Sequence, residues 1–156
     1  MNNLYLMQHG IANPTNIDPD ESLSEKGRDI IKMSAIGLKK INISFDVIIC
    51  SPKKRSIQTA QIIADIFKFP ENNIMETDKV KPMTPAEETL EFISKYERVF
   101  IAGHLPSIKE IISYLLYPTA SIEVDVHNGG CTRIDFDNQK PVLKWHLTPN
   151  ILKLIK

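Results

Sequence analysis

The sequence predicts an α/β fold, a three-layer α/β/α sandwich with a mostly parallel mixed sheet and an antiparallel C-terminal portion. Two observations lead to this class. Short apolar runs typical of buried strands alternate with helical patterns from residue 4 to residue 116, which favours parallel strands with helices on both faces. From residue 122 onward, strand patterns follow one another with only turns between them, which favours antiparallel pairing.

Length, charge and cysteine content narrow the class of protein. The 156 residues, 42% of them hydrophobic, suffice for a single domain over residues 1–156. Nineteen basic residues balance nineteen acidic ones, so we expect no general nucleic-acid partner and no membrane partner. The sequence shows no signal-peptide pattern and no apolar run of membrane-spanning length, which favours a cytoplasmic protein. Cys50 and Cys131 lie in strand-like runs and are expected to be buried thiols.

The first strand is predicted from the apolar run Leu4–Met7, which ends at Gln8-His9-Gly10. We expect Gly10 to let the backbone turn sharply, which places His9 at the carboxyl end of a buried strand. In open α/β sheets this edge is where ligands bind. A lone histidine here more often satisfies a turn, so its interpretation depends on the later strands.

A helix follows the polar loop Ile11–Asp20. Ser24 is its predicted N-cap, and the helix continues to Lys40. Its apolar residues recur at helical spacing, as expected for a helix that packs one face on a sheet; they are Ile30, Ile31, Ala35 and Leu38.

The second strand, residues 45–50, leads directly into Ser51-Pro52. Serine as N-cap and proline at the first helical position predict a helix that runs to about Phe67. Arg55 then lies in or just past the first turn, where free backbone N–H groups and the helix dipole favour an anion. We expect the two lysines before Arg55 to be solvated.

The middle of the chain is less regular. A short strand is predicted around Ile74-Met75. A helix with Thr84 as its cap and Pro85 at its first position should run to about Lys95.

The strand Arg98–Ala102 repeats the layout of the first one, because it ends at Gly103-His104-Leu105-Pro106. Pro106 should open a helix from Ser107 to about Leu116. The C-terminal part is predicted to hold strands over residues 122–126, 131–136 and 142–147, with turns at 128–130 and 137–138.

Parallel strands open their polar turns on one edge of the sheet, so His9, Arg55 and His104 should converge. This set of groups suits phosphoryl transfer. A neutral imidazole can attack phosphorus in line and carry the phosphoryl group. An arginine can bind two of its oxygens, and a second, protonated histidine can neutralise developing charge. The chemistry needs no metal and no other cofactor.

A zinc hydrolase is the competing use of two histidines. Zinc would need a third protein ligand and would place a cation beside Arg55, which is electrostatically poor. The metal interpretation is therefore the weaker one.

The sequence resembles the histidine phosphatase superfamily, which has the phosphoglycerate-mutase-like fold, and within it the short SixA-type phosphohistidine phosphatases. The resemblance covers essentially the whole chain, and its most specific block is the one that begins at Ser51. The matching residues are Leu4 to Gly10, Leu23-Ser24-x-x-Gly27, Ser51-Pro52-x-x-Arg55-x-x-Gln58-Thr59-Ala60, Gly103 to Pro106, and Trp145-x-Leu147-Thr148-Pro149-x-x-Leu152.

The resemblance implies that His9 is the nucleophile, transiently phosphorylated, and that Arg55 and His104 bind the phosphoryl group. Gln58 and Thr59 are expected to be structural. One departure concerns Gln8, where the family usually has arginine. Glutamine keeps neutral donors for phosphate but loses the fixed charge and two-pronged fork, which lowers the expected rate. Losing a transition-state donor costs roughly 10²–10³ in rate, and a weaker donor should cost less.

The substrate expected from the resemblance is phosphohistidine on a protein such as a phosphotransfer domain, with a phosphate ion held in the site. Larger family members use a carboxylic acid to protonate alkoxide leaving groups, whereas an imidazole leaving group needs little protonation. The acidic residues in the corresponding part of the chain are expected to be solvated; they are Glu76, Asp78, Glu87 and Glu88. Two alternatives remain, a small-molecule phosphomonoesterase and a phosphate- or phosphoprotein-binding module in which Gln8 has abolished turnover.

Overall fold

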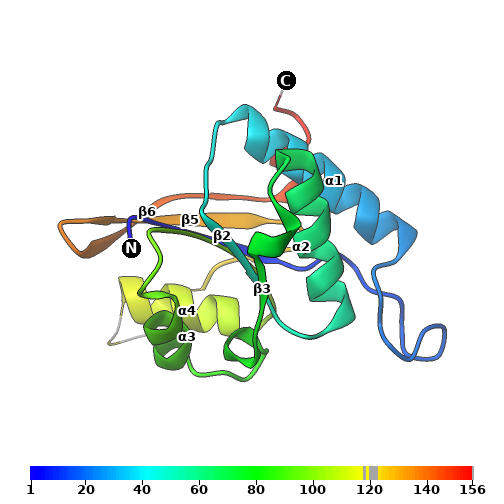
Figure 1. Ribbon diagram of the computed structural model, residues 1–156, viewed down its shortest axis with the longest axis horizontal. Helices are drawn as coiled ribbons and strands as arrows, with labels where there is room; N and C mark the ends of the chain where they lie inside the picture. The colour runs from blue at the N-terminus through cyan, green and yellow to red at the C-terminus, as the bar shows by residue number, and fades with distance from the viewer. Residues whose placement is uncertain (118, 120–122, 156) are drawn as a thin grey trace.

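The computed structural model describes residues 1–117, 119 and 123–155, and in this part of the chain one sheet has six strands in the order β3-β2-β4-β1-β5-β6 (Figure 1). Neighbours among the first four strands of that order pair in parallel, and β5 and β6 pair antiparallel. The predicted mixed sheet is confirmed. The strands are β1 (Asn3–Gln8), β2 (Val47–Cys50), β3 (Ile74–Glu76), β4 (Arg98–Gly103), β5 (Cys131–Asp137) and β6 (Lys140–Leu147).

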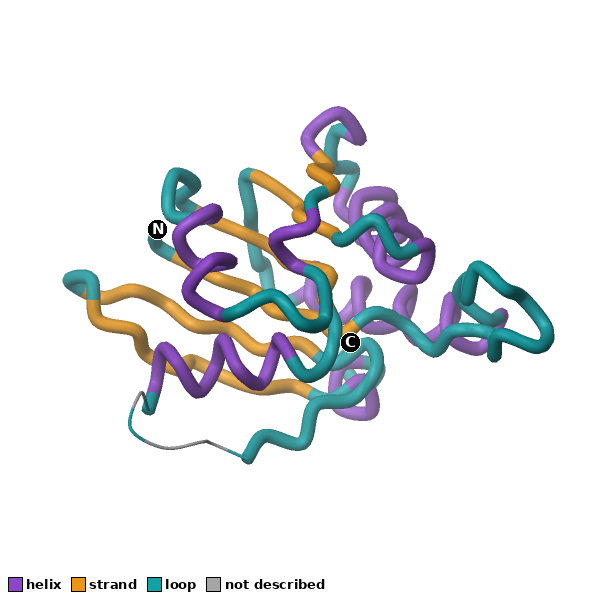
Figure 2. The backbone as a smooth tube through the Cα atoms, turned by 90° about the horizontal axis from the view of Figure 1, so that it is seen from below, coloured by secondary structure: helices purple, strands orange, loops and turns teal. Residues whose placement is uncertain are grey.

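Helices cover both faces of the sheet, as Figures 1 and 2 show from two directions. One face carries α1 (Glu25–Lys40), α2 (Lys54–Phe67) and the short α5 (Pro149–Leu152). The other face carries α3 (Ala86–Ile93) and α4 (Ser107–Leu116). Two 3₁₀ helices, η1 (Glu71–Asn73) and η2 (Asp78–Val80), flank β3. The three-layer arrangement therefore follows the alternation of apolar runs and helical patterns.

The core lies in two layers, one on each face of the sheet. Tyr5 and Met7 of β1 pack toward α1 and α2, whereas Leu4 and Leu6 pack toward α3 and α4. This alternation is the two-residue period of a strand, and all four side chains are buried. Burying one such side chain stabilises the fold by about 1.5–3 kcal/mol, so the strand that leads to His9 is firmly anchored.

Two predicted helix starts are wrong by a short distance. The helix after β2 has Lys53 at its N-cap position and begins at Lys54, so Ser51 is not its cap. The hydroxyl of Ser51 instead contacts the side chain of His104, which follows β4. The helix α3 begins at Ala86, after Pro85. The predicted N-cap of α1 is confirmed, because Ser24 Oγ accepts the Gly27 N–H at 3.0 Å.

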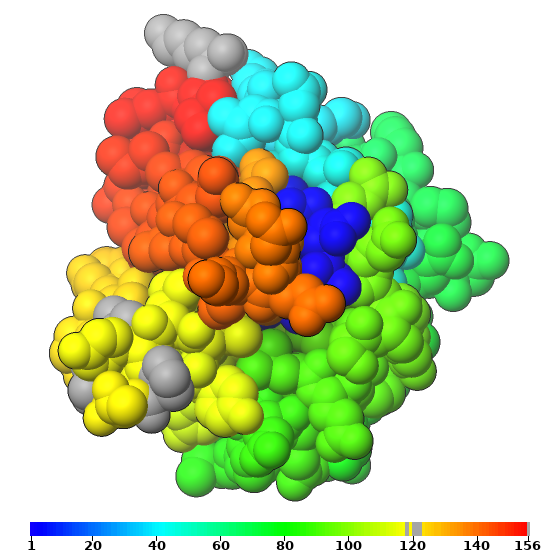
Figure 3. Space-filling view, turned by 90° about the vertical axis from the view of Figure 1, so that its left-hand side faces the viewer, coloured from blue at the N-terminus to red at the C-terminus, as the bar shows by residue number. Residues whose placement is uncertain are grey.

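The strand predicted over residues 122–126 is also wrong where it can be judged. Residue 122 lies outside the described residues, and residues 123–126 are not strand. The Val126 N–H donates to the Val124 carbonyl at 3.0 Å, a tight turn that an extended strand does not allow. The side of β1 that faces away from β4 is taken by β5, and Figure 3 shows the β5–β6 hairpin (orange) next to the N-terminal residues (blue).

Candidate active site

The structure brings His9, Arg55 and His104 together at the carboxyl edge of the sheet. His9 follows β1, His104 follows β4, and Arg55 lies in the first turn of α2, directly after β2. Arg55 Nε is 3.1 Å from His9 Nε2. The rings of His9 and His104 meet edge to face with centroids 4.9 Å apart. The convergence expected from parallel strands is present.

Two hydrogen bonds define the tautomer of His9. Its Nδ1 lies 2.7 Å from the Gly10 carbonyl oxygen, an acceptor, so Nδ1 is assigned the proton. Its Nε2 then has a free lone pair, which accepts the Arg55 Nε–H. The pKa of His9 is lowered to about 4, mainly by burial and also by the nearby Arg55 cation, although the Gly10 hydrogen bond acts in the opposite direction. His9 is therefore a neutral imidazole at neutral pH, with Nε2 directed at the guanidinium.

The backbone around His9 is held from three sides. The His9 N–H donates to the Gly103 carbonyl at 2.9 Å, and the Gly10 N–H donates to Thr59 Oγ1 at 3.1 Å. Asn128 Nδ2 donates to the His9 carbonyl at 2.7 Å, although the sequence offers no motif around Asn128 that identifies this contact. Thr59 Oγ1 also donates to the Arg55 carbonyl at 2.8 Å, so this hydroxyl links the two functional residues.

Gly10 is required for a different reason from the one expected. Among the described glycines, positive φ occurs at Gly129, and Gly10 has none. A Cβ at Gly10 would lie 2.9 Å from the carbonyl oxygen of Gly27. A Cβ at Gly27 would overlap the backbone of Ile11. The two glycines therefore allow the loop after His9 to pack directly on the first turn of α1.

His104 is almost fully buried, with 1% of its surface exposed. Its Nε2 is 2.6 Å from Ser51 Oγ, and its Nδ1 has no hydrogen-bond partner among the described residues. The pKa of His104 is lowered to about 3, mainly by burial and to a smaller extent by His9, Arg55 and Lys53. The protonated second histidine predicted from the sequence is thus neutral at neutral pH, because it is desolvated and faces cationic neighbours.

Arg55 also contacts a residue that the sequence did not indicate. Its Nη1 is 3.1 Å from Glu21 Oε2, in the loop between β1 and α1, and its Nη2 makes no hydrogen bond to any residue the structure describes. Glu21 belongs to no motif, and its loop carries no pattern that places it beside α2. Nothing in the local sequence could have identified it.

Gln8, the third predicted phosphate ligand beside Arg55 and His104, ends β1 but makes no side-chain hydrogen bond within the described chain. Its Oε1 is buried without a partner. The structure therefore places Gln8 next to His9 in the chain without joining its amide to the other three side chains.

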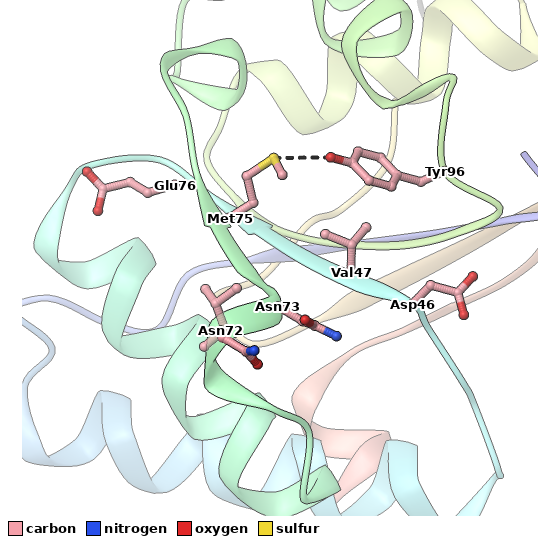
Figure 4. Close-up of a pocket in the computed structure, with 8 residues that line it drawn as sticks. Asp46, Val47, Asn72, Asn73, Met75, Glu76 and Tyr96 are labelled. Carbon is pink, nitrogen blue, oxygen red and sulfur yellow. Dashed lines mark hydrogen bonds between the residues drawn. The ribbon is translucent and has the colours of Figure 1, made fainter.

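Two surface hollows of similar volume are lined by different residues, and one of them is next to Arg55. One, of about 480 Å³, lies beside Arg55, between the loop that carries Glu21 and the start of α2. The other, of about 470 Å³, lies at the open side of β3, where the hydroxyl of Tyr96 meets the sulfur of Met75 at 3.3 Å (Figure 4). The lining of the first hollow includes Arg55 but neither His9 nor His104, and no predicted site residue lines the second.

Within the described residues, no group of three or more His, Cys, Asp or Glu side chains could hold a metal ion. Cys50 and Cys131 are both buried and free, as predicted. No described helix is long and apolar enough to cross a membrane. Of the acidic residues considered as proton donors, Asp78 and Glu88 form exposed ion pairs with Lys81 and Lys79 at 2.7 and 2.8 Å.

The fold and this cluster of two histidines and one arginine define a class of protein that sequence comparison also identifies. The sequence model of the histidine phosphatase superfamily (branch 1) matches residues 4–79, which include His9 and Arg55. Over residues 4–79 the chain is therefore similar in sequence to the histidine phosphatase superfamily. A curated relative, an uncharacterized protein of Picosynechococcus sp., is 28% identical over 135 residues, which is 81% of each chain.

Solved structures share the whole fold. The protein histidine phosphatase SixA complexed with tungstate superposes with a TM-score of 0.85 at 19% identity, covering 97% of this chain and 99% of that one. Phosphoserine phosphatase from Entamoeba histolytica in complex with 3-phosphoglyceric acid superposes with a TM-score of 0.75 at 20% identity, covering 97% and 100%. The phosphoglycerate-mutase-like fold of SixA-type proteins predicted from the sequence is confirmed.

Proposed function

We propose that this chain is a cytoplasmic phosphatase that hydrolyses phosphohistidine on a protein, through a phosphoryl group carried by His9. The observation that supports this most directly is the Nε2 lone pair of a neutral His9 placed 3.1 Å from Arg55 Nε. A neutral imidazole is the form that attacks phosphorus, and the adjacent guanidinium is suited to phosphoryl oxygens.

In the first step, His9 Nε2 attacks phosphorus and the P–N bond to the substrate imidazole breaks, with its electron pair staying on the leaving nitrogen. The leaving imidazole departs neutral when its other nitrogen carries a proton. Arg55 Nε exchanges His9 for one phosphoryl oxygen, and the free Nη2 binds a second. Water then attacks the phosphoryl-His9 and releases inorganic phosphate, which regenerates the imidazole.

His104 has a complementary role in this proposal. Its Nδ1 is buried, has no hydrogen-bond partner among the residues that the structure describes, and lies on a ring in contact with His9. A bound phosphoryl dianion would raise the pKa of His104 from its low value, so that Nδ1 takes up a proton and donates to an oxygen. Ser51 holds the opposite ring nitrogen and so sets the direction of Nδ1.

A protein substrate is favoured over a small phosphate ester for a chemical reason. The carboxylate that reaches the site, Glu21, already accepts a hydrogen bond from the Arg55 guanidinium at 3.1 Å, so it is poorly placed to donate a proton to a leaving group. An ester would leave as an alkoxide and need an acid, whereas an imidazole does not. The fold shared with phosphoserine phosphatase favours a second candidate, hydrolysis of small phosphate esters.

The test is phosphate release from a phosphorylated histidine phosphotransfer domain, compared with phosphoserine as substrate. Wild type should dephosphorylate the domain, His9→Ala should lose activity by about 10³-fold or more, and His127→Ala, an exposed histidine, should not. Faster turnover of phosphoserine than of the phosphodomain would favour the second candidate, and full activity in His9→Ala would exclude the proposed intermediate.

Gln8→Arg adds a positive donor beside the nucleophile and should raise the turnover number by up to about 10²-fold. The measurement is the same phosphate release. If wild type binds phosphate without turnover and Gln8→Arg is active, the chain is a binding module rather than a working phosphatase.

A further inference from the structure

One carboxylate reaches the candidate site from the loop between β1 and α1. Glu21 Oε2 accepts a hydrogen bond from Arg55 Nη1 at 3.1 Å, and 14% of the Arg55 side chain and 38% of the Glu21 side chain are exposed. Arg55 Nε contacts His9 Nε2 at the same distance of 3.1 Å. The guanidinium is thus held at two different nitrogens by two different parts of the chain.

These two contacts fix the plane of the guanidinium, because its N–H groups point in rigid directions. Nη1 lies on the side of the group next to Cδ, whereas the N–H bonds of Nε and Nη2 run side by side along the opposite edge. The contact with Glu21 therefore engages Nη1 and leaves the Nε and Nη2 edge as the one available for a two-pronged phosphoryl contact. The Nε and Nη2 edge remains directed toward His9.

The backbone at Glu21 has a conformation that decides which substitutions it tolerates. Glu21 has a φ of 50°, in the left-handed region that favours glycine. The other described non-glycine residues with positive φ lie where such values are common, after helices or in the β5–β6 turn; they are Asn42, Lys68, Asn138 and Gln139. Glu21 closes the turn that begins at Asp18, just before the antiparallel bridge between Leu23 and Ala12, so the loop maintains its conformation.

The loop is tied to the helix that carries Arg55. The Glu21 N–H donates to the Asp18 carbonyl at 2.9 Å, and the Leu23 N–H donates to Gln58 Oε1 on α2 at 2.7 Å. Because Gln58 lies one turn after Arg55 on the same helix, the carboxylate and the guanidinium are positioned relative to each other by α2 itself.

We propose that Glu21 is a positioning residue for Arg55, an inference that rests on the proposed function. Its carboxylate holds the guanidinium so that the Nε and Nη2 edge meets the phosphoryl group as charge develops. Removing it leaves the charge of Arg55 in place but frees its orientation. The loss should therefore affect the turnover number more than KM.

The variants are Glu21→Ala, Glu21→Gln and the matched control Asp20→Ala. Asp20 is the neighbouring carboxylate, and it forms an ion pair of the same 3.1 Å length with Lys54, whose side chain is exposed. Glu21→Ala should lower kcat for the phosphodomain by about 10-fold, keep KM within about 2-fold and weaken tungstate binding by a similar factor to kcat. Glu21→Gln, which can still accept a hydrogen bond from Nη1, should recover most of the loss. Asp20→Ala should leave kcat, KM and tungstate affinity unchanged.

A further variant separates positioning from folding. Glu21→Gly suits the positive φ, so its melting temperature should stay within a few degrees of wild type while kcat falls as in Glu21→Ala. Tungstate affinity, measured by calorimetry, does not depend on turnover and tests Glu21 even if the phosphohistidine substrate is wrong. Tighter tungstate binding by Glu21→Ala would mean that the carboxylate competes with the phosphoryl group. That result, or unchanged affinity and kcat, overturns the proposal.

Discussion

Acid should destabilise this protein well above the pH at which most carboxylates titrate, because two buried histidines stay neutral in the fold. His9 and His104 have pKa values lowered from 6.5 to about 4 and about 3. Between 6.5 and these values the unfolded chain binds protons that the folded chain does not. The free energy of unfolding therefore falls as pH falls below 6.5, and the histidine contribution is fully present above that pH.

The magnitude follows from the same values. One pKa unit corresponds to about 1.4 kcal/mol, and about 1.5 units separate the ordinary histidine value from about pH 5. Each histidine should then lower the free energy of unfolding by about 2 kcal/mol, and the two together by about 4 kcal/mol. That is a large fraction of the about 5–15 kcal/mol typical of a folded domain. Asp46 and Asp135, whose pKa values are lowered, titrate below this range and do not obscure it.

The assay is urea unfolding followed by circular dichroism at several pH values from about 7 to about 5. His104→Gln removes one titrating group and keeps a nitrogen for Ser51, so it should lose about half of the pH dependence. His127→Gln replaces a histidine whose side chain is 49% exposed and serves as the control. A wild-type free energy of unfolding that is flat over this range, or an undiminished slope in His104→Gln, would refute the reasoning.

Two further predictions concern the support of the site. Ser51→Ala removes a buried hydroxyl that lies 2.6 Å from His104 Nε2. The free energy of unfolding should fall by about 1–3 kcal/mol and kcat should fall about 10-fold. An unchanged melting curve and an unchanged kcat would contradict this prediction. Gly27→Ala places a methyl group against the backbone of Ile11 and should cost about 1–3 kcal/mol, which thermal unfolding would detect; wild-type stability would show that the loop can move away at no cost.

The sequence predicted those features that depend on short-range patterns. The continuous apolar runs before His9 and His104 identified buried strands, and parallel pairing of such strands brings their ends together whatever the loops do. Ser51 shows where this reasoning stops. Serine before proline is a strong local signal for a helix cap, but its actual partner His104 is 53 residues away, and no local pattern encodes that contact.

The contact of Glu21 was not predicted, and the strand predicted at residues 123–126 is wrong, for related reasons. Glu21 lies in a loop without periodicity, and its contact with Arg55 exists only once α2 has packed beside that loop. Residues 123–126 alternate in polarity as a strand does, yet β5 already pairs with β1 on that side of the sheet. Alternation describes which faces a segment could present, but it does not specify a partner strand with which the segment pairs.

The position of β1 inside the sheet has a consequence for synthesis. β1 is paired on one side with β4, residues 98–103, and on the other with β5, residues 131–137, and Asn128 binds the His9 carbonyl across 119 residues of chain. A ribosome makes the chain in order, at about 5–20 residues per second, so the strand that bears His9 emerges long before either of its neighbours. Its apolar run must remain unpaired for that interval, and vectorial folding cannot enclose it. His9 is therefore synthesised before the strands that hold it in place, and its surroundings are complete only when the hairpin of β5 and β6 closes the sheet.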